Sequence, residues 1–219
     1  MDEAVFAEFP KIARYSREAI VTEKIDGTNA QVYIADVFSP GFIEAEPLKR
    51  LAIVGALAIW AGSRTRWITP EDDNFGFASW VKENAESLIK LGPGRHFGEW
   101  YGSGIQRGYG LVNGERRWSL FNVSRWCLHN QEPKVIPQPD PRKAKVQDVL
   151  PACVGLVPEL WRGPFDDIPM RSILERLQAH GSYAAPGFLD PEGVVIYHTA
   201  GNALFKKTLA KDAEPKSKQ

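Results

Sequence analysis

The feature of this sequence that most constrains its fold is a tight turn between two strand-like runs. The turn has the sequence EKIDGTN at residues 23–29, with apolar residues before it at positions 20–21 and an alternating run after it at positions 30–34. Gly27 allows a positive φ and a close approach of the backbone to a ligand. We therefore expect Lys24 to end a strand beside the turn, where its side chain is held in place.

A lysine in this position has two interpretations. A lysine and an aspartate beside a β-turn are common on protein surfaces, where they carry no chemistry. Alternatively, Lys24 is a nucleophile, provided that neighbouring cations or desolvation favour its uncharged amine. The turn alone leaves both interpretations open.

Composition sets the class of protein. With 219 residues, 43% of them hydrophobic, the chain is long enough for one domain of ample size. The 27 basic and 27 acidic residues balance, which excludes coating of nucleic acid through overall charge but permits a local basic groove. Cys127 and Cys153 do not make a disulfide framework or a metal site. No apolar run could span a membrane and the N-terminus is acidic, so we expect a cytoplasmic protein.

The rest of the chain alternates β-rich segments with two helices. The expected elements are a β-rich segment at 51–62, a helix at 74–91, strands at 96–102, 117–126 and 154–157, a second helix from Asp166 to Gly181, and a hairpin at 192–197 and 202–209. The glycine-rich loop at 103–114 is expected to be mobile near a site. Residues 132–151 read as a charged, proline-punctuated connection.

Several charged residues in these segments are candidates for binding. Arg64 and Arg66 alternate on an extended chain, so they point the same way and suit either a phosphate or a salt-bridged sheet rim. Glu99 lies in the aromatic run HFGEWYG. A glutamate there is either paired within the structure or bonded to a ligand hydroxyl.

Four patterns follow one another along the chain: EKIDGTN, FGEWYG, LFNV, and EGVVIY followed by FKK. Each is weak alone, but in this order they resemble the motifs of the covalent nucleotidyltransferases, which comprise ATP-dependent DNA and RNA ligases and mRNA capping enzymes. The RNA ligase 2 family is the most similar, because its nucleophile motif carries asparagine, here Asn29, where many DNA ligases carry arginine. The resemblance covers residues 23–207.

The resemblance implies a role for each matching residue. Lys24 resembles the nucleophile that attacks the α-phosphate of ATP to form lysyl-AMP. Lys206 resembles a catalytic lysine that contacts the α-phosphate, and Glu192 the carboxylate that holds Mg²⁺ or Mn²⁺. The nucleotide contacts implied besides these are Glu23, Ile25 and Asn29 around the nucleophile, Arg64 at the sugar or a phosphate, Glu99 at the ribose and Phe121 at the adenine.

The sequence departs from the family pattern in two places. The last motif usually carries two lysines at alternate positions, whereas Lys206 and Lys207 are adjacent, and a strand sends adjacent side chains to opposite faces. We choose Lys206, because the opposite register would bury Phe205 in the polar site. The third motif usually ends in phenylalanine-aspartate, and here Phe121 is followed by Asn122.

The implied fold is α+β: a nucleotidyltransferase domain of ligase type over residues 1–209, with mostly antiparallel sheets, flanking helices and the nucleotide between the sheets. The ten residues after Leu209 are too few for the C-terminal oligonucleotide-binding barrel of many relatives, and we expect residues 210–219 to be a disordered charged tail. This shortness weighs most against a capping enzyme.

The implied function is ATP-dependent ligation of RNA ends, joining a 3′-hydroxyl to a 5′-phosphate with Mg²⁺ or Mn²⁺ as cofactor. A minimal DNA ligase is the second choice. A non-catalytic module that binds nucleotides or RNA ends stays open, although such a module does not need a nucleophilic lysine. Nucleotidyl transfer to a small molecule or a protein is a further possibility. We expect nucleic acid as the partner, no membrane, and a monomer.

Overall fold

The computed structural model describes residues 8–40, 42, 46–136 and 141–210. One group of strands comprises β2 (Thr28–Asp36), β3 (Ala52–Val54), β4 (Leu57–Gly62), β5 (Trp67–Ile68), β6 (Gly94–Gly102), β7 (Arg116–Leu120) and β12 (Gly155–Leu156). A second group comprises β1 (Glu18–Lys24), β13 (Glu159–Pro164), β14 (Gly193–His198) and β15 (Ala203–Thr208). Short strands are β8 (Trp126–Cys127), β9 (Val135–Ile136), β10 (Lys145–Val146) and β11 (Asp148–Val149). The α-helices are α1 (Phe77–Glu83), α2 (Ala85–Leu88) and α3 (Met170–His180), and single 3-10 turns lie at Pro47–Lys49, Ile89–Leu91, Gly108–Gly110, Pro141–Lys143 and Phe165–Asp167.

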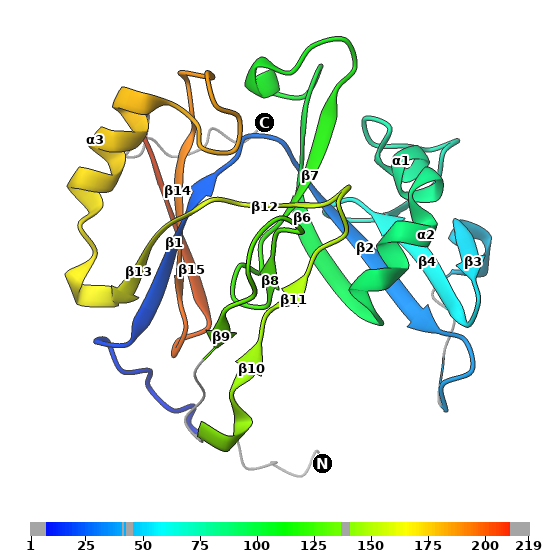
Figure 1. Ribbon diagram of the computed structural model, residues 1–219, viewed down its shortest axis with the longest axis horizontal. Coiled ribbons are helices and arrows are strands. Elements are labelled where there is room, and N and C mark those ends of the chain that lie inside the picture. Colours follow the sequence, from blue (N-terminus) through cyan, green and yellow to red (C-terminus); the bar gives the residue numbers. More distant parts are fainter. Residues whose placement is uncertain (1–7, 41, 43–45, 137–140, 211–219) are drawn as a thin grey trace, which may run out of the picture.

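These strands form two main sheets, one on each side of the molecule (Figure 1). The larger sheet has the order β12-β7-β6-β2-β4-β3, with β5 beside β4, and the smaller has the order β13-β1-β14-β15. β12 pairs with β7 in parallel, and the other neighbours in these two sheets pair antiparallel. The expected α+β class with mostly antiparallel sheets and flanking helices is confirmed.

Helices cover the outer face of each sheet (Figure 1). In the larger sheet, apolar side chains such as Val32 and Trp118 pack against α1 and α2, where Phe77 is fully buried. In the smaller sheet, Val21 packs with Ile173 of α3. Burial of such side chains is the main favourable term in folding, so these two packed layers hold the sheets in place.

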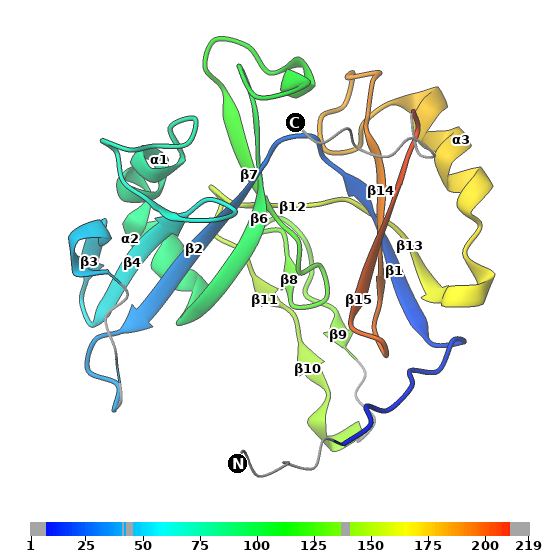
Figure 2. The ribbon, with the colours of Figure 1, turned by 180° about the vertical axis from the view of Figure 1, so that it is seen from behind.

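The inner faces of the two sheets face each other rather than the helices. Side chains alternate along a strand, so those between the packed positions project toward the other sheet. On β1, Ile20 belongs to a cluster with Tyr101 of β6 and Val123, which joins the two sheets, and Lys24 lies further along the same face. Figures 1 and 2 both show the turn between β1 and β2 passing from one sheet to the other.

The helix expected at 74–91 is shorter and broken. Phe75 and Gly76 have positive φ angles of 52° and 75°, so helical geometry begins only at Phe77. At Asn84 the backbone leaves helical geometry, and α2 and a 3-10 turn complete the segment. The Asp73 carboxylate caps the start of α1, because it accepts hydrogen bonds from the backbone N–H groups of residues 78 and 79.

Other boundaries also differ from the expected ones. The strand expected at 117–126 ends at Leu120, because the Asn122 side chain accepts a hydrogen bond from the Arg125 N–H and forms a turn. The segment at 51–62 is two strands around Gly55, which has a φ of 59°. The connection at 132–151 contains β9, β10 and β11, and β13 was not expected at all. α3 begins at Met170 rather than Asp166.

The C-terminal hairpin is confirmed, with β14 and β15 paired from Gly193 opposite Thr208 to His198 opposite Ala203. The tail expected to be disordered lies outside the described residues from position 211 onward. Among the described residues no oligonucleotide-binding barrel follows the hairpin. Nor does the described part of the chain contain a helix with the length and apolar character needed to cross a membrane.

Candidate active site

Lys24 is the last residue of β1, a strand that pairs with β13 on one side and β14 on the other. Its Nζ lies 2.5 Å from Oε2 of Glu192, and their side chains are 24% and 17% exposed. The residue opposite Lys24 is Gly193, where a Cβ atom would lie 2.2 Å from the Lys207 carbonyl oxygen. The sheet therefore holds the amine beside a carboxylate at a place that solvent can still reach.

Glu99 on β6 organises the other side of the turn. Its carboxylate accepts hydrogen bonds from the Gly27 N–H at 3.1 Å and from Nδ2 of Asn29 at 2.9 Å. Asn29 in turn accepts a bond from Nε of Arg64 at 3.2 Å. Burial raises the pKa of Glu99 from its ordinary 4.5 to about 7, against the opposing effects of Asn29 and the nearby Lys24. Three residues expected at the site are thus joined in one chain of contacts.

Gly27 serves a purpose different from the one expected. Its φ is not positive, and a Cβ atom there would lie 2.4 Å from the Trp100 carbonyl oxygen. The missing side chain therefore lets the turn approach β6 closely, rather than a ligand. This close approach is what allows the Gly27 N–H to reach Glu99.

Two residues that fix the turn, Arg107 and Tyr109, were not assigned a role from the sequence. Nε of Arg107 donates to Asp26 at 3.0 Å, and its Nη1 contacts Asp190 at 2.7 Å. The Tyr109 hydroxyl accepts a bond from the Asp26 N–H and donates one to the Lys24 carbonyl oxygen. The glycine-rich loop at 103–114, which was expected to be mobile near a site, contacts the turn through these two side chains. Its glycines gave no signal that Tyr109 would be buried beneath the turn.

The register of the smaller sheet shows where the adjacent lysines project. Lys206 lies opposite Val195, which lies opposite Thr22, two residues before Lys24. Opposed residues share a face of the sheet, and so do residues two apart on a strand. Lys206 is therefore on the inner face with Lys24, and Lys207 is on the outer face that carries α3.

Phe121 and Phe205 lie in different surroundings. Phe121 follows β7, is 43% exposed, and donates its backbone N–H to the Phe97 carbonyl oxygen at 3.0 Å. Continuing the pairing of β6 with β7 places it on the inner face with Glu99. Phe205 is on the outer face of the smaller sheet, with its ring centroid 5.8 Å from that of Phe165. This agrees with the expectation that Phe205 does not enter the polar site.

Glu23 and Ile25 have side chains that the structure does not bring to Lys24. Glu23 is on the outer face, and its carboxylate accepts hydrogen bonds from the Ser182 hydroxyl and from the backbone N–H groups of residues 183 and 184. Burial raises the pKa of this carboxyl. Ile25 is buried in the cluster that joins the sheets. Arg66, the alternate partner of Arg64, forms a salt bridge with Asp72 at 2.5 Å.

The residues at the site fit a divalent cation that arrives with phosphates. Glu192 lies beside Lys24, and Glu99 interacts electrostatically with both. Within the described ranges, no group of three or more His, Cys, Asp or Glu side chains could hold a metal on its own. Mg²⁺ is usually bound by one or two carboxylates together with water and substrate phosphates. Glu192 beside the amine of Lys24, with Lys206 on the same face of the sheet, is one carboxylate in such surroundings.

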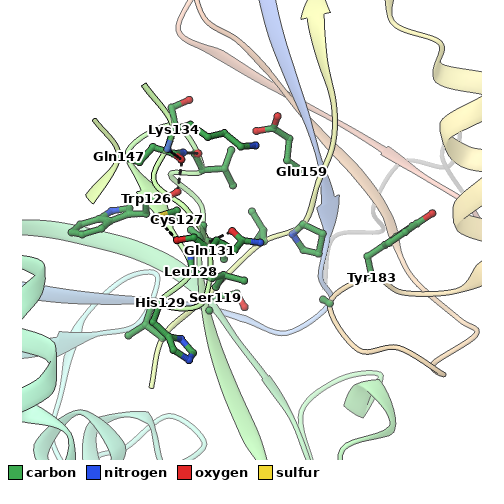
Figure 3. A pocket seen from close by; sticks show the side chains of 18 of the residues that line it. Ser119, Trp126, Cys127, Leu128, His129, Gln131, Lys134, Gln147, Glu159 and Tyr183 are labelled. Atoms are coloured by element: carbon green, nitrogen blue, oxygen red, sulfur yellow. Dashed lines mark hydrogen bonds between the residues drawn. The ribbon is translucent and has the colours of Figure 1, made fainter. Parts of the chain in front are cut away.

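A cavity of about 1550 Å³ opens elsewhere, beside β7, β8 and β13 (Figure 3). Figure 3 shows Ser119, His129, Lys134, Glu159 and Tyr183 around it. Its lining mixes basic and acidic side chains and includes none of the residues expected at the site. This cavity is therefore separate from the pair formed by Lys24 and Glu192.

Comparison with known proteins identifies the family to which this chain belongs. A protein-family model described as RNA ligase matches residues 17–211. No curated protein matches the sequence.

Among solved structures, a mutant of the Naegleria gruberi RNA ligase with ATP and Mn is 19% identical, with a TM-score of 0.53 and coverage of 93% of this chain and 53% of that one. A second mutant of that ligase with ATP and Mn is 18% identical, with a TM-score of 0.49 and coverage of 89% and 49%. The first likeness shows a shared fold. This chain spans about half the length of these structures.

Proposed function

Because this chain belongs to the RNA ligase family, we propose that it is an ATP-dependent RNA ligase that joins a 3′-hydroxyl to a 5′-phosphate through a lysyl-AMP intermediate. The observation that carries this proposal is the position of Lys24, held at the end of a strand with its amine 2.5 Å from the Glu192 carboxylate. The contact chain from Arg64 through Asn29 to Glu99 supports it, because it lies beside the same turn.

The first step forms a bond between Nζ of Lys24 and the α-phosphorus of ATP, breaks the bond to pyrophosphate, and releases a proton from the amine. Glu192 is the acceptor in position for that proton. The amine attacks in line with the leaving group, so the rigid end of β1 contributes by orientation. Lys206, on the same face, neutralises charge on the phosphate.

The nucleotide would be held by the inner faces of both sheets. Glu99 and Asn29 would hydrogen-bond the ribose, and Arg64 would bind the sugar or a phosphate. Phe121 offers an exposed ring for the adenine. With their side chains engaged elsewhere, Glu23 and Ile25 would contact the nucleotide through their backbone. Mg²⁺ or Mn²⁺, held by Glu192 and the phosphates, would supply positive charge at the reacting phosphate.

In the later steps AMP passes to a 5′-phosphate, breaking the bond to Lys24, and a 3′-hydroxyl then displaces AMP to seal the strand. A DNA ligase would use the same residues and is the second candidate. The asparagine at position 29 favours RNA. A non-catalytic end-binding module is disfavoured by the paired Lys24 and Glu192, which such a module does not need.

The remaining parts of the proposal concern the setting of the protein. We propose that residues 1–209 form one domain that acts as a monomer in the cytoplasm, in pathways that repair RNA. The two free cysteines, Cys127 and Cys153, suit a reducing compartment.

The test is transfer of label from ATP labelled at its α-phosphate, with Mg²⁺, followed on a denaturing gel. The wild type should acquire an acid-labile label, and Lys24→Ala should acquire none while unfolding at the same urea concentration. Lys90→Ala, on the outer side of the larger sheet, is the matched control and should label like the wild type. Label on Lys24→Ala would move the nucleophile elsewhere.

A parallel reaction with GTP separates the neighbouring classes. Label from GTP alone would favour a capping-type enzyme. No label from either nucleotide, on folded protein that mass spectrometry shows is not already adenylylated, would favour the binding module. Sealing of RNA in preference to DNA by the labelled enzyme would separate the first candidate from the second.

A further inference from the structure

The inner face of the larger sheet continues beyond Glu99 as a row of aromatic and basic side chains. In the pairing of β2 with β6, Gln31 lies opposite Phe97 and Tyr33 opposite Arg95, in step with Asn29 opposite Glu99. These residues therefore share the face of Glu99.

Trp67 belongs to the same face. It lies opposite Gly62, which lies opposite Gln31 on β2. Its ring centroid is 5.9 Å from that of Tyr33. We call Phe97, Arg95, Tyr33 and Trp67 the aromatic strip.

The strip begins with Phe97, next to a second exposed phenylalanine outside the strip. Phe97 is 51% exposed and lies beside Phe121, which is 43% exposed, and a backbone hydrogen bond of 3.0 Å links the two residues. Phe121 is the ring proposed for the adenine. Neighbouring exposed aromatic side chains mark binding surfaces more often than isolated ones do. Phe97 is thus a second flat surface next to the nucleotide.

The strip continues with a stacked arginine. The guanidinium carbon of Arg95 lies 4.6 Å from the ring centroid of Tyr33 and 5.1 Å from that of Trp67. Its Nη1 donates to Gln31 at 3.1 Å, which fixes the side chain across the sheet. Arg95 is exposed, so the donors that Gln31 does not use can bind a phosphate.

The charge on this face suits a polyanion. Among the described residues of β2 and β6 that project inward, Glu99 is the one carboxylate, and it is engaged by the turn. Arg64 lies at the near end of the strip, beside Asn29, and Arg95 lies at the far end. Two cations therefore flank a row of flat side chains, the combination that binds single-stranded nucleic acid through phosphates and stacked bases.

We propose that the aromatic strip binds the single-stranded RNA that leads away from the reacting end. One base stacks on Phe97, the next lies on the Arg95–Tyr33–Trp67 group, and Arg95 binds a phosphate beside them. This inference rests on the proposed function, because the strip is continuous with the nucleotide site. The aromatic strip holds the RNA polymer after its end has entered that site.

The test measures binding of a short fluorescein-labelled single-stranded RNA by fluorescence anisotropy over a range of salt concentrations. Phe97→Ala should weaken binding about tenfold, the size of effect that loss of one stacked base produces. Arg95→Gln should lower the slope of log K against log salt by about 0.7, as expected for one phosphate contact on a single strand. A base-free oligonucleotide of the same length should bind Phe97→Ala and the wild type equally.

Two matched controls lie off the strip. Phe38→Ala removes a phenylalanine that is 80% exposed, and Arg171→Gln removes an arginine of α3 whose side chain is 92% exposed. Both should bind RNA like the wild type. Should Phe97→Ala fail to fold, Phe97→Leu removes the ring and keeps the bulk, and it should weaken binding about as much.

Self-labelling with ATP, measured in the same preparations, reports the proposed function separately. If the wild type labels itself but the Phe97 and Arg95 variants bind RNA as tightly as the two controls, the proposed role of the aromatic strip is wrong. The proposed ligase function would then be unaffected. A wild type that does not label itself but shows the predicted binding losses would overturn the ligase and leave the strip as a binding surface for RNA.

Discussion

The two faces of the smaller sheet carry neighbouring polar residues that differ in their exposure and in their hydrogen-bond partners. On the inner face, Lys24 and Lys206 are polar, partly or fully exposed, and near the turn. On the outer face, Glu23 is 1% exposed and bonded to the segment after α3, and Lys207 projects the same way. One step along the backbone thus separates a residue that holds the fold from one that is available for chemistry.

This difference predicts which substitutions change stability and which change activity. On the outer face a polar residue is satisfied by its own chain, so its loss should be read in stability. On the inner face the polar residues are only partly engaged, so their loss should be read in activity. Matched pairs across the two faces test this division directly.

The largest effect is expected for the adjacent lysines. Lys206→Ala should slow self-labelling with ATP by about 10²- to 10³-fold, the usual consequence of removing one group that stabilises charge in the transition state. Lys207→Ala should change the rate by about threefold or less, because its side chain is on the face that carries α3. The measurement is the single-turnover rate at saturating ATP. A larger loss for Lys207→Ala would show that the register is reversed.

The next effect is on the pH dependence of stability through Glu99. Its pKa is raised to about 7, so the folded protein keeps a proton that the unfolded chain loses near pH 4.5. The stabilisation is complete below pH 4.5 and is lost as the pH rises through 7, by about 3 kcal/mol in all. Urea unfolding at pH 5 and pH 8 should show a larger loss in the wild type than in Glu99→Gln, in which the raised pKa of Glu23 still contributes. Equal losses in both proteins would assign the pH dependence to another group.

The smallest effect is expected for the buried carboxylate on the outer face. Glu23→Gln replaces one acceptor oxygen by a donor, which should cost about 1–3 kcal/mol of unfolding free energy. The rate of self-labelling should stay near that of the wild type. Glu192→Gln is its counterpart on the inner side and should do the reverse, with slower labelling, a weakened response to Mg²⁺ and nearly unchanged stability. Slow labelling by Glu23→Gln in folded protein would break the division between the faces.

Much of this arrangement could be predicted from the sequence. Strand alternation predicted the strands on either side of the Lys24 turn and the C-terminal hairpin. The order of the motifs indicated the family. Alternation also explains why Lys206 was the right choice for the inner face. These are local patterns, and period-two alternation survives whatever the tertiary context is.

The features that the sequence did not reveal depend on tertiary contacts. The hydrogen bonds that turn the Glu23 side chain away from Lys24 come from donors about 160 residues further along the chain. The hydrogen bonds of Tyr109 to the turn also span more than 80 residues. The helix at 74–91 was overextended because positive φ at Phe75 has no signature in composition. No local window contains these contacts.

Arg107 has a consequence for how the protein can fail. It bridges Asp26, in the turn that carries the nucleophile, and Asp190, two residues before Glu192, so one side chain ties the lysine and the carboxylate to the same loop. Local opening of residues 103–114 would release both at once. The active site is therefore expected to assemble and come apart as a unit, so that in a partly damaged preparation each molecule is either fully active or inactive, and slow enzyme would report fewer working molecules.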